Sequence, residues 1–428
     1  MKVLWLVNGM MPEMAVALGL RGANTGGWMP SLISALHTYS PEIELSFICE
    51  WRRDAEVEVE GCRHFALRQM NGPLLLQGRS SREEFGKKIK SIIERVKPDL
   101  VHFHGTENGY LDFPDEVWSG VPRLVSLQGV INGIHPHYLG GLTPRQLRPH
   151  RNWIRYLATG HDLFDIADSW RERVAKGEAV SLARVRHIAG RTEWDRAWAE
   201  ALAPHATYYR LGEIMRPEFY GQGAPTNVRD PHRIFASAAF KYPLKGGHTL
   251  LEALSILKRD FPDVKLAIAD SLAKIAPSGL LGWARTTEYH GFLRKLIKGL
   301  GLTDNIELLP SLNASRVVEE LRKAAVYCQA SFVENSPNSL AEAQLVGTPV
   351  VATYVGGIPS MVNDGENGAL IPAGDPASMA RAISNFFRNP ERAASMSSRA
   401  RVVAFQRHDA KSIAQNVLDC YRNVIRNG

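Results

Sequence analysis

The sequence predicts an α/β protein made of two units, each with a parallel sheet and crossover helices. Short apolar runs alternate with segments of helical periodicity along the chain, which is typical of such sheets. The length of 428 residues is too great for one ordinary core and fits two domains. Between the two halves lies a segment rich in Pro, Gly and polar residues, 217–232, which is the best candidate for a linker.

The first half holds short apolar runs that predict buried strands at 2–7, 45–49, 100–103, 123–127 and near 185–188. A helix is expected to open at Gly26-Gly27. Residues 81–96 place apolar side chains at helical spacing with lysines outside, and Pro98 ends this predicted helix. The rest of 143–210 is expected to be helical.

The second half begins near Arg216 and repeats the alternation. Its predicted strands lie at 234–238, 265–269, 306–309, 326–329 and 350–353. Its predicted helices lie at 249–258, 286–300, 317–324, 340–346, 377–389 and about 410–426. Two units of this kind bind ligands at the carboxyl ends of their strands.

Charge excludes little by itself. The formal net charge is +7, with 51 Lys and Arg against 44 Asp and Glu. The excess is shared by both halves, and no basic stripe interleaves with aromatic residues, so we expect no nucleic-acid partner. Anionic substrates fit the charge equally well. The lysines of 81–96 form a solvated face or, as the weaker alternative, touch an anionic membrane.

The four cysteines, Cys49, Cys62, Cys328 and Cys420, have no CxxC spacing, so we expect buried, inert thiols and no metal site. The apolar start of the chain is interrupted early and favours a first strand over a signal peptide. No uninterrupted apolar run approaches the ~18 residues of a membrane span. We therefore expect a cytoplasmic protein, with peripheral contact to the inner face of the plasma membrane as an extension.

One stretch, 331–359, carries the clearest chemistry. A strand ends near Gln329, Glu334 lies in the following loop, and Pro337-Asn338-Ser339 opens a helix. Free N–H groups and the positive dipole end make such a helix start a cradle for a diphosphate. Glu342, eight residues after Glu334, can accept hydrogen bonds from sugar hydroxyls. The alternative is that Asn335-Ser336 merely caps the helix and Glu342 is solvated.

The Glu334 to Glu342 spacing resembles the E-x7-E arrangement of retaining GT-B glycosyltransferases, specifically glycosyltransferase family 4. Further segments match that family in type and order, and these are Gly26-Gly27, 98–105, Lys245-Gly246, 347–359 and 364–368. The resemblance covers essentially the whole chain. It implies two Rossmann-like domains facing a central cleft: an acceptor-binding domain 1–215, a donor-binding domain 216–410, and a C-terminal helix 411–428 that packs back on the first.

The resemblance also implies roles in the donor half. Lys245 meets the donor diphosphate, Glu342 binds its ribose, and Glu334 lies near the transferred sugar. The backbone N–H groups of Asn338, Ser339 and Leu340 contact the diphosphate. The family has an Arg five or six residues before the lysine, where this chain has Phe240 and Ala239. Either Lys241 or Arg216 is expected to take the place of this arginine. The alternative for Lys241 is that it is a plain loop lysine.

In the first half, Gly26 and Gly27 match a glycine pair beside the acceptor and diphosphate, or form an ordinary turn. Gln128 stands where many relatives have His, and it cannot take a proton. His104 is a candidate for the acceptor site, whereas His102 is expected to be a satisfied buried histidine. The basic segment 135–150 is an acceptor-facing loop or a solvated one.

A second group of acceptor-sugar candidates is Trp194, Asp195 and Arg196, although helix packing explains Trp194 equally well.

The leading hypothesis is a metal-independent, retaining hexosyl- or hexosaminyltransferase that needs no cofactor. It would move a sugar from a UDP- or GDP-sugar to a hydroxyl of a glycan or lipid-linked acceptor. No carboxylate pair for double displacement is evident, and the resemblance implies front-face attack instead. The segments 190–196 and 216–220 are similar to enzymes of capsule, lipopolysaccharide and other envelope polysaccharide synthesis. Alternatives are a sugar-nucleotide epimerase of the same fold and a non-catalytic partner protein.

Overall fold

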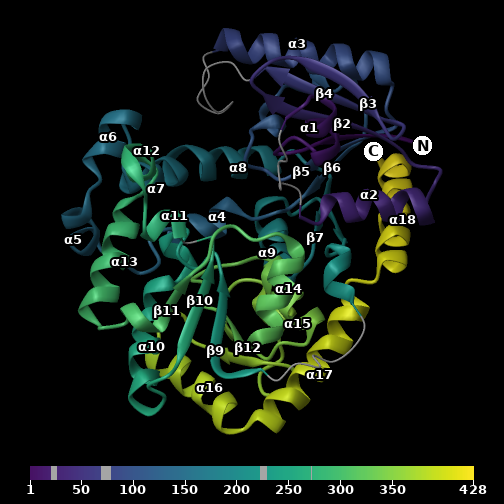
Figure 1. Ribbon diagram of the computed structural model, residues 1–428. Coiled ribbons are helices and arrows are strands. Elements are labelled where there is room, and N and C mark those ends of the chain that lie inside the picture. Colours follow the sequence, from purple (N-terminus) through teal and green to yellow (C-terminus); the bar gives the residue numbers. More distant parts are fainter. Residues whose placement is uncertain (21–26, 69–78, 222–228, 271) are drawn as a thin grey trace. The chain divides into compact units, whose positions relative to one another are not determined.

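The structure is a computed structural model that describes residues 1–20, 27–68, 79–221, 229–270 and 272–428. The chain forms two compact units (Figure 1). The first unit holds residues 1–132, 172–215 and 408–428, and the second holds 133–171 and 216–407.

An eight-stranded sheet with the order β3-β4-β2-β1-β5-β6-β7-β8 forms the centre of the first unit. Its strands are β1 (Lys2–Leu6), β2 (Glu44–Trp51), β3 (Ala55–Val59), β4 (Cys62–Arg68), β5 (Leu100–His104), β6 (Arg123–Ser126), β7 (His187–Gly190) and β8 (Thr207–Arg210). All neighbours are parallel except the β3–β4 hairpin. The order reverses between β1 and β5, so their carboxyl ends mark a ligand-binding position.

Seven α-helices of the first unit lie within the described residues. They are α1 (Pro12–Ala17), α2 (Met29–Tyr39), α3 (Arg79–Val96), α4 (Ile131–Ile134), α8 (Ala175–Leu182), α9 (Glu193–Leu202) and α18 (Ala410–Asn427). From α3, Phe85 and Ile89 enter one core cluster with Leu4 and Trp118. Burial of such side chains contributes roughly 1.5–3 kcal/mol each.

The C-terminal helix α18 lies beside α2 (Figure 1). The hydroxyl of Tyr421 accepts a hydrogen bond of 3.0 Å from the indole of Trp5 and is 2.8 Å from Nδ1 of His102. These bonds fasten α18 to β1 and β5. The prediction that the C-terminal helix returns to the N-terminal half is confirmed.

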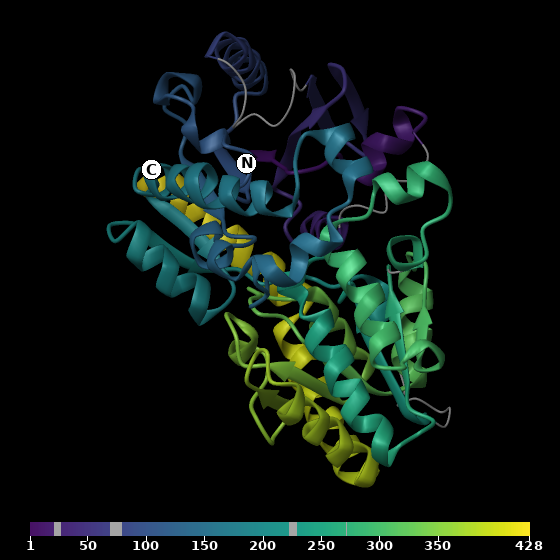
Figure 2. The same cartoon turned by 90° about the vertical axis from the view of Figure 1, so that its left-hand side faces the viewer.

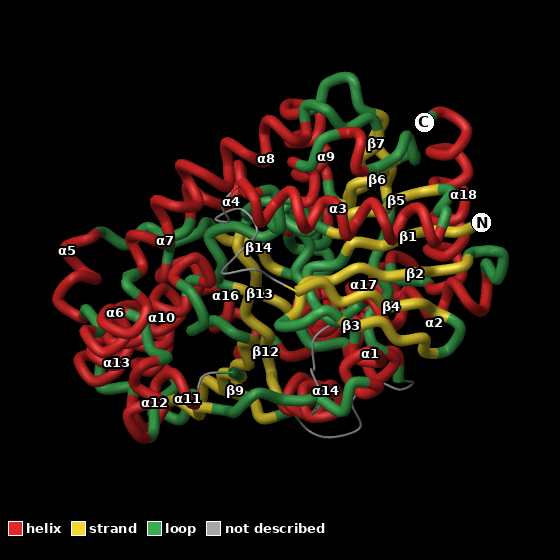
Figure 3. Tube along the Cα trace, turned by 90° about the horizontal axis from the view of Figure 1, so that it is seen from above, coloured by secondary structure: helices red, strands yellow, loops and turns green. Residues whose placement is uncertain are grey.

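A six-stranded parallel sheet with the order β11-β10-β9-β12-β13-β14 forms the second unit. Its strands are β9 (Asp230–Ser237), β10 (Lys265–Ala269), β11 (Ile306–Leu308), β12 (Ala324–Gln329), β13 (Val350–Thr353) and β14 (Ala369–Ile371). Figure 3 shows β12, β13 and β14 following one another across it. The order reverses between β9 and β12, which again places a binding position at their carboxyl ends.

Helices that follow these strands cover the sheet, and Figure 2 shows them as green and yellow ribbons. They are α10 (Gly247–Asp260), α11 (Leu272–Ile275), α12 (Gly279–Ala284), α13 (Glu288–Gly299), α14 (Ala314–Lys323), α15 (Asn338–Val346), α16 (Pro376–Arg388) and α17 (Pro390–Arg407). The α/β class and the two parallel-sheet Rossmann-like units predicted from the sequence are confirmed.

The compact units differ from the sequence-based division in residues 408–410, which that division gave to the second half, and in residues 133–171, which the division after residue 215 gave to the first. This segment contains α5 (Pro144–Leu147), the single turn η5 (Arg148–His150), α6 (Trp153–Thr159) and α7 (Leu163–Ser169). The Asn152 side chain donates to the carbonyl oxygens of Trp283 and Thr286 at 2.7 and 2.8 Å. These bonds hold the start of α6 on the second unit. The roles of the two halves in donor and acceptor binding stay predictions.

Two further expectations concern the cysteines and the membrane. All four cysteines are buried and free. Burial raises the pKa of the Cys49, Cys328 and Cys420 thiols to about 12, so these thiols are protonated and inert, as predicted. Among the described residues, no helix combines the length and the apolar character that crossing a membrane requires.

Candidate functional site

Two predicted charged residues meet at the strand-order reversal of the second unit. Lys245 follows β9 through the short turn η8 (Pro243–Lys245), and Glu334 follows β12. The ammonium of Lys245 lies 2.6 Å from the carboxylate of Glu334. Both side chains are largely buried, at 27% and 11% exposure, so this ion pair is only weakly screened by water.

Close backbone packing aligns the two loops. Gly246 has a φ of +70°, and a Cβ at this position would lie 1.9 Å from the carbonyl oxygen of Ala330. The amide of Phe332 donates to the carbonyl of Leu244 at 2.7 Å. Only glycine fits such an approach with a left-handed backbone. The close packing at Gly246 therefore holds Lys245 against the loop after β12.

Glu334 is oriented by several donors. Besides Lys245, its Oε1 accepts from the hydroxyl of Ser331 at 2.7 Å and the side-chain amide of Gln329 at 3.0 Å. The Glu334 carbonyl accepts from the amide of Gly357 at 2.9 Å. A carboxylate held by this many groups has one fixed direction, which a group that must position a reactant requires.

Helix α15 begins directly after this loop. Its N-cap is Pro337, so neither Asn335 nor Ser336 stands at the N-cap position. Asn338, Ser339 and Leu340 are its first three residues, as predicted. The Leu340 amide donates to the carbonyl of Pro337 at 3.0 Å, so the Asn338 and Ser339 amides are the better anion donors. The helix dipole favours negative charge at this end.

Glu342 lies one turn into α15 and is buried, not solvated. Its Oε1 accepts a hydrogen bond of 2.8 Å from Arg216. Burial raises the pKa of the Glu342 carboxyl, and the guanidinium of Arg216 opposes that rise. The Arg216 guanidinium also lies 4.9 Å from the centre of the Phe219 ring. Glu342 thus offers a second oxygen for ligand hydroxyls.

The two candidates for the second cation are placed differently. Arg216 lies against Glu342, whereas Lys241 is exposed and has its ammonium 5.5 Å from the centre of the Tyr242 ring. A guanidinium beside the buried Glu342 carboxylate, next to the α15 start, is better placed for an anionic ligand than a lysine held over an exposed ring. The structure therefore favours Arg216.

Sequence reasoning missed Gln329 as part of this site. Its side chain bridges Glu334 and the α15 start, because Nε2 donates to Glu334 at 3.0 Å and Oε1 accepts from the Ser339 hydroxyl at 3.3 Å. The Tyr327 hydroxyl also donates to Oε1, at 2.8 Å. Gln329 is the last residue of β12. Its position at a strand end beside the reversal was the signal that could have indicated it.

In the first unit, His102 and His104 share one face of β5, with ring centres 4.0 Å apart. His102 is buried and bonds Tyr421 and Ser126 at 2.8 and 2.7 Å, which confirms the prediction of a satisfied core histidine. His104 is buried, and neither ring nitrogen has a hydrogen-bond partner among the described residues. Burial, with help from Arg191, lowers the pKa of His104 to about 3, so the ring is neutral.

Gln128 and His104 line one small hollow at the carboxyl ends of β5, β6 and β7. Arg191 crosses these ends and donates to the backbone carbonyls of Leu127 and Gln128 at 2.9 and 3.0 Å. Its guanidinium also pairs with Glu213. Arg191 therefore fixes the loop that carries Gln128.

The remaining first-half candidates are the glycine pair and two residues at the start of α9. Gly27 has a φ of +36°, and Gly26 lies outside the described residues. Asp195 is fully buried and accepts from the Arg191 amide at 2.8 Å and the Tyr208 hydroxyl at 2.6 Å. This carboxylate is occupied in capping α9. Trp194 packs against the core cluster of the first unit, which agrees with the alternative of helix packing.

No group of three or more metal-ligating side chains is found within the part of the chain that the structure describes.

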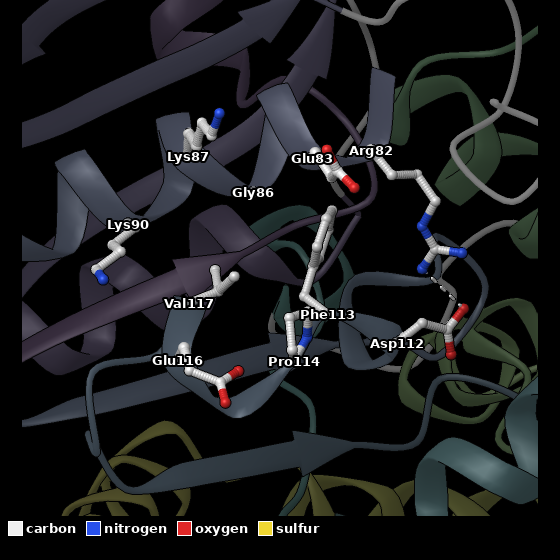
Figure 4. A pocket seen from close by; sticks show the side chains of 10 residues that line it. All are labelled: Arg82, Glu83, Gly86, Lys87, Lys90, Asp112, Phe113, Pro114, Glu116 and Val117. Carbon is white, nitrogen blue, oxygen red and sulfur yellow. Dashed lines mark ion pairs between the residues drawn. The ribbon is translucent and has the colours of Figure 1, made fainter. Parts of the chain in front are cut away.

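A separate hollow of about 690 Å³ lies along α3 (Figure 4). Phe113, Pro114 and Val117 give it an apolar wall, and Lys87 and Lys90 lie on the α3 side. Arg82 pairs with Asp112 at its end, at 3.3 Å. Glu83, Asp112 and Glu116 also line it, so the rim of this apolar hollow carries charges of both signs.

Comparison with known proteins finds a family match over most of the second unit. Residues 224–403 match the family model described as glycosyl transferases group 1. The D-inositol 3-phosphate glycosyltransferase of Streptomyces coelicolor is 34% identical over 149 residues, or 35% of this chain and 31% of that protein. Its counterpart in Corynebacterium kroppenstedtii is 32% identical over 43% of this chain and 39% of that protein. The chain thus aligns with between three and four tenths of the length of these relatives.

Solved structures match over nearly the whole chain. Sucrose-phosphate synthase from Thermosynechococcus elongatus has a TM-score of 0.72 at 16% identity, with complete coverage of both chains. HepE of Anabaena, in complex with UDP and glucose, has a TM-score of 0.64 at 16% identity over 98% of each chain. WaaG, a glycosyltransferase involved in lipopolysaccharide biosynthesis, has a TM-score of 0.63 at 12% identity over both full chains. At such identities the likeness shows the fold, which is that of GT-B glycosyltransferases.

Proposed function

We propose that the protein is a retaining glycosyltransferase that transfers a sugar from a nucleoside diphosphate sugar to a hydroxyl acceptor. The observation that supports it most is the Lys245–Glu334 ion pair beside the uncapped start of α15, with Glu342 buried one turn later. This arrangement lies within the segment that matches glycosyl transferases group 1. It offers a cation, a helix dipole and a buried carboxylate for diphosphate and ribose.

Each group has one task in the reaction. Lys245 has three N–H donors, so one can remain on Glu334 while the others reach diphosphate oxygens. Its charge stabilises the leaving group as the bond between the sugar C1 and the phosphate oxygen breaks. The acceptor oxygen forms the new bond to C1 on the same face, and its proton passes to the departing diphosphate. Glu334 positions the transferred sugar, and no protein base is required.

In the first unit, His104 and Gln128 are both uncharged hydrogen-bonding side chains. A histidine whose pKa is about 3 cannot serve as a charged acid near neutral pH. Both side chains can donate or accept hydrogen bonds to hydroxyl groups. We assign them a positioning role toward the acceptor or the transferred sugar.

The acceptor is proposed to be a glycan or lipid-linked sugar of envelope polysaccharide synthesis, in line with the involvement of WaaG in lipopolysaccharide biosynthesis. The lysines beside the α3 hollow would touch the anionic head groups of the membrane that carries such an acceptor (Figure 4).

Two measurements test the reaction. A thermal-shift panel of UDP-, GDP- and ADP-sugars should give one clear rise, because a ligand of the native state stabilises it. The selected donor is then turned over with envelope glycan acceptors, and NMR of the product anomer reports retention. Lys245→Ala should abolish turnover while Lys241→Ala, which removes an exposed lysine, should not.

Near-normal turnover in Lys245→Ala would overturn the proposal. Epimerised donor formed without acceptor would favour the epimerase alternative, and absence of any nucleotide binding would favour a non-catalytic partner.

A further inference from the structure

The second unit also contains a cavity whose lining includes none of the proposed donor residues. It has a volume of about 590 Å³ and is built by η5, α6, α7 and the first residue of α13. Its lining combines the aromatic rings of Trp153 and Phe164 with arginines and carboxylates. Figure 1 shows α6 and α7 near α13. A hollow of this size accommodates a small ligand.

Glu288 supplies an unusual acceptor to this cavity. Its side chain lines the cavity and is only 1% exposed. Neither carboxylate oxygen has a hydrogen-bond partner among the residues that the structure describes. A buried carboxylate without donors is costly, so a ligand or water with N–H or O–H groups is needed to satisfy it.

Arg151 supplies the complementary donor. Its guanidinium lies 3.9 Å from the centre of the Tyr156 ring and 4.7 Å from that of Trp153. One terminal nitrogen pairs with Asp162 at 3.2 Å. The Nε atom is buried and has no partner within the described chain. The cavity lining therefore includes unsatisfied acceptors on Glu288 and an unsatisfied donor on Arg151.

This combination selects a class of ligand. An ammonium ion would face Arg148 and Arg151, and a phosphate would face Glu288 and the aspartates of α7. A neutral polyhydroxyl compound meets neither repulsion, because each hydroxyl both donates and accepts. The ring of Trp153, 60% exposed, offers a flat apolar surface for the C–H face of a pyranose.

We infer that this cavity is an accessory carbohydrate-binding site, with Trp153 stacking on a neutral sugar and Glu288 accepting its hydroxyl protons. The inference rests on the proposed function only in placing the site on a protein that handles glycans. It would hold a part of an oligosaccharide away from the reacting sugar.

The test measures binding to the full chain without nucleotide. Saturation-transfer difference NMR with maltotriose, cellotriose and N,N′-diacetylchitobiose should show transfer to at least one sugar, with a change in tryptophan emission. Trp153→Ala should weaken that binding about tenfold or more, equivalent to the ~1.4 kcal/mol that one decade represents. Glu288→Gln should also weaken it. Trp283→Ala is the matched control, because Trp283 is 42% exposed and does not line the cavity.

The proposal is overturned by folded protein that shows no transfer to any of the three sugars, or by unchanged binding in Trp153→Ala. Binding of spermidine or inorganic phosphate in place of the sugars would also overturn it. If Glu288→Gln fails to fold, Trp153→Ala decides alone, because its side chain lies largely at the surface. UDP binding is measured separately by calorimetry, so failure of the donor site and failure of this cavity are distinguishable.

Discussion

Arg216 and Glu342 form a hydrogen-bonded ion pair of 2.8 Å between residues 126 positions apart. Arg216 is the first residue of the second segment that builds the second unit, and Glu342 lies inside α15. Burial raises the pKa of the Glu342 carboxyl and so favours its protonated form, and the positive charge of Arg216 opposes this rise. It also places a planar cation beside the oxygen proposed to bind the donor ribose.

Replacing Arg216 should weaken nucleotide binding. In Arg216→Met the affinity for the preferred nucleoside diphosphate should fall about tenfold by calorimetry, while that for the nucleoside alone falls less, because a diphosphate gains more from the cation. Arg216→Lys should recover part of the loss. Lys241→Met is the control and should bind as the wild type does. Equal losses for nucleoside and diphosphate would show that Arg216 does not serve the phosphates.

The raised pKa of Glu342 predicts a pH dependence of donor binding. The ionised carboxylate accepts ribose hydroxyls and the protonated one accepts fewer, so affinity should fall as pH drops through this pKa. Arg216 lowers that pKa, so in Arg216→Met the fall should move to higher pH. Glu342→Gln should bind weakly with no such pH dependence. Calorimetric titrations from pH 5 to 8 compare the three proteins, and a pH profile that Glu342→Gln retains would contradict the assignment.

Much of the second unit was predictable because its strands are apolar and end at charged or glycine-rich loops. The predicted strands 265–269 and 350–353 coincide with β10 and β13. Lys245 and Glu334 meet because both follow strands at the order reversal. Such strand-end residues converge in any doubly wound sheet, so their contact follows from topology.

Other features depend on contacts that spacing does not reveal. The β3–β4 hairpin was missed because its turn is Glu60-Gly61, both at positive φ, where the commoner signal is Asn-Gly. The strands β8 and β14 and the helix α17 were missed as well. The attachment of 133–171 to the second unit depends on contacts between distant residues, such as the bonds of Asn152 to Trp283 and Thr286 and the 3.0 Å contact of His248 with the Gly140 carbonyl. Nothing in local periodicity encodes such a bond.

Close packing at Gly246 predicts a large loss of stability on substitution. In Gly246→Ala the new Cβ would strike the backbone carbonyl of Ala330, at a residue whose φ is +70°. We expect the free energy of unfolding to fall by about 2–4 kcal/mol, measured by urea denaturation. Gly301→Ala is the control, because Gly301 has a φ of +64° but open space around its Cβ position. It should cost only about 1 kcal/mol, and equal losses would show that strain alone is responsible.

The lysines beside the α3 hollow predict binding to anionic membranes. Replacing Lys87 and Lys90 together with Gln should reduce the affinity for phosphatidylglycerol vesicles, measured by sedimentation, by about thirtyfold, since each cation contributes roughly 1 kcal/mol near such a surface. Lys258 and Lys298, on helices of the second unit, serve as the control pair. Binding that is unchanged in Lys87→Gln, Lys90→Gln would dismiss the membrane role of α3. Donor turnover in solution should be unaffected.

His104 predicts how stability responds to acid. Its pKa is lowered to about 3 by burial, whereas an unfolded histidine titrates near 6.5. Below pH 6.5 the unfolded chain therefore takes up a proton that the folded chain does not, and stability is lost as pH falls from 6.5 toward 3. One such group contributes a slope of about 1.4 kcal/mol per pH unit within that window.

His104→Gln should reduce the slope by up to this amount in urea denaturation series at pH 4 to 7. The exposed His205, changed in the same way, is the control and should leave the slope as it is. An unaltered slope in His104→Gln would show that the ring takes up its proton in the folded protein, through a water or ligand that satisfies it.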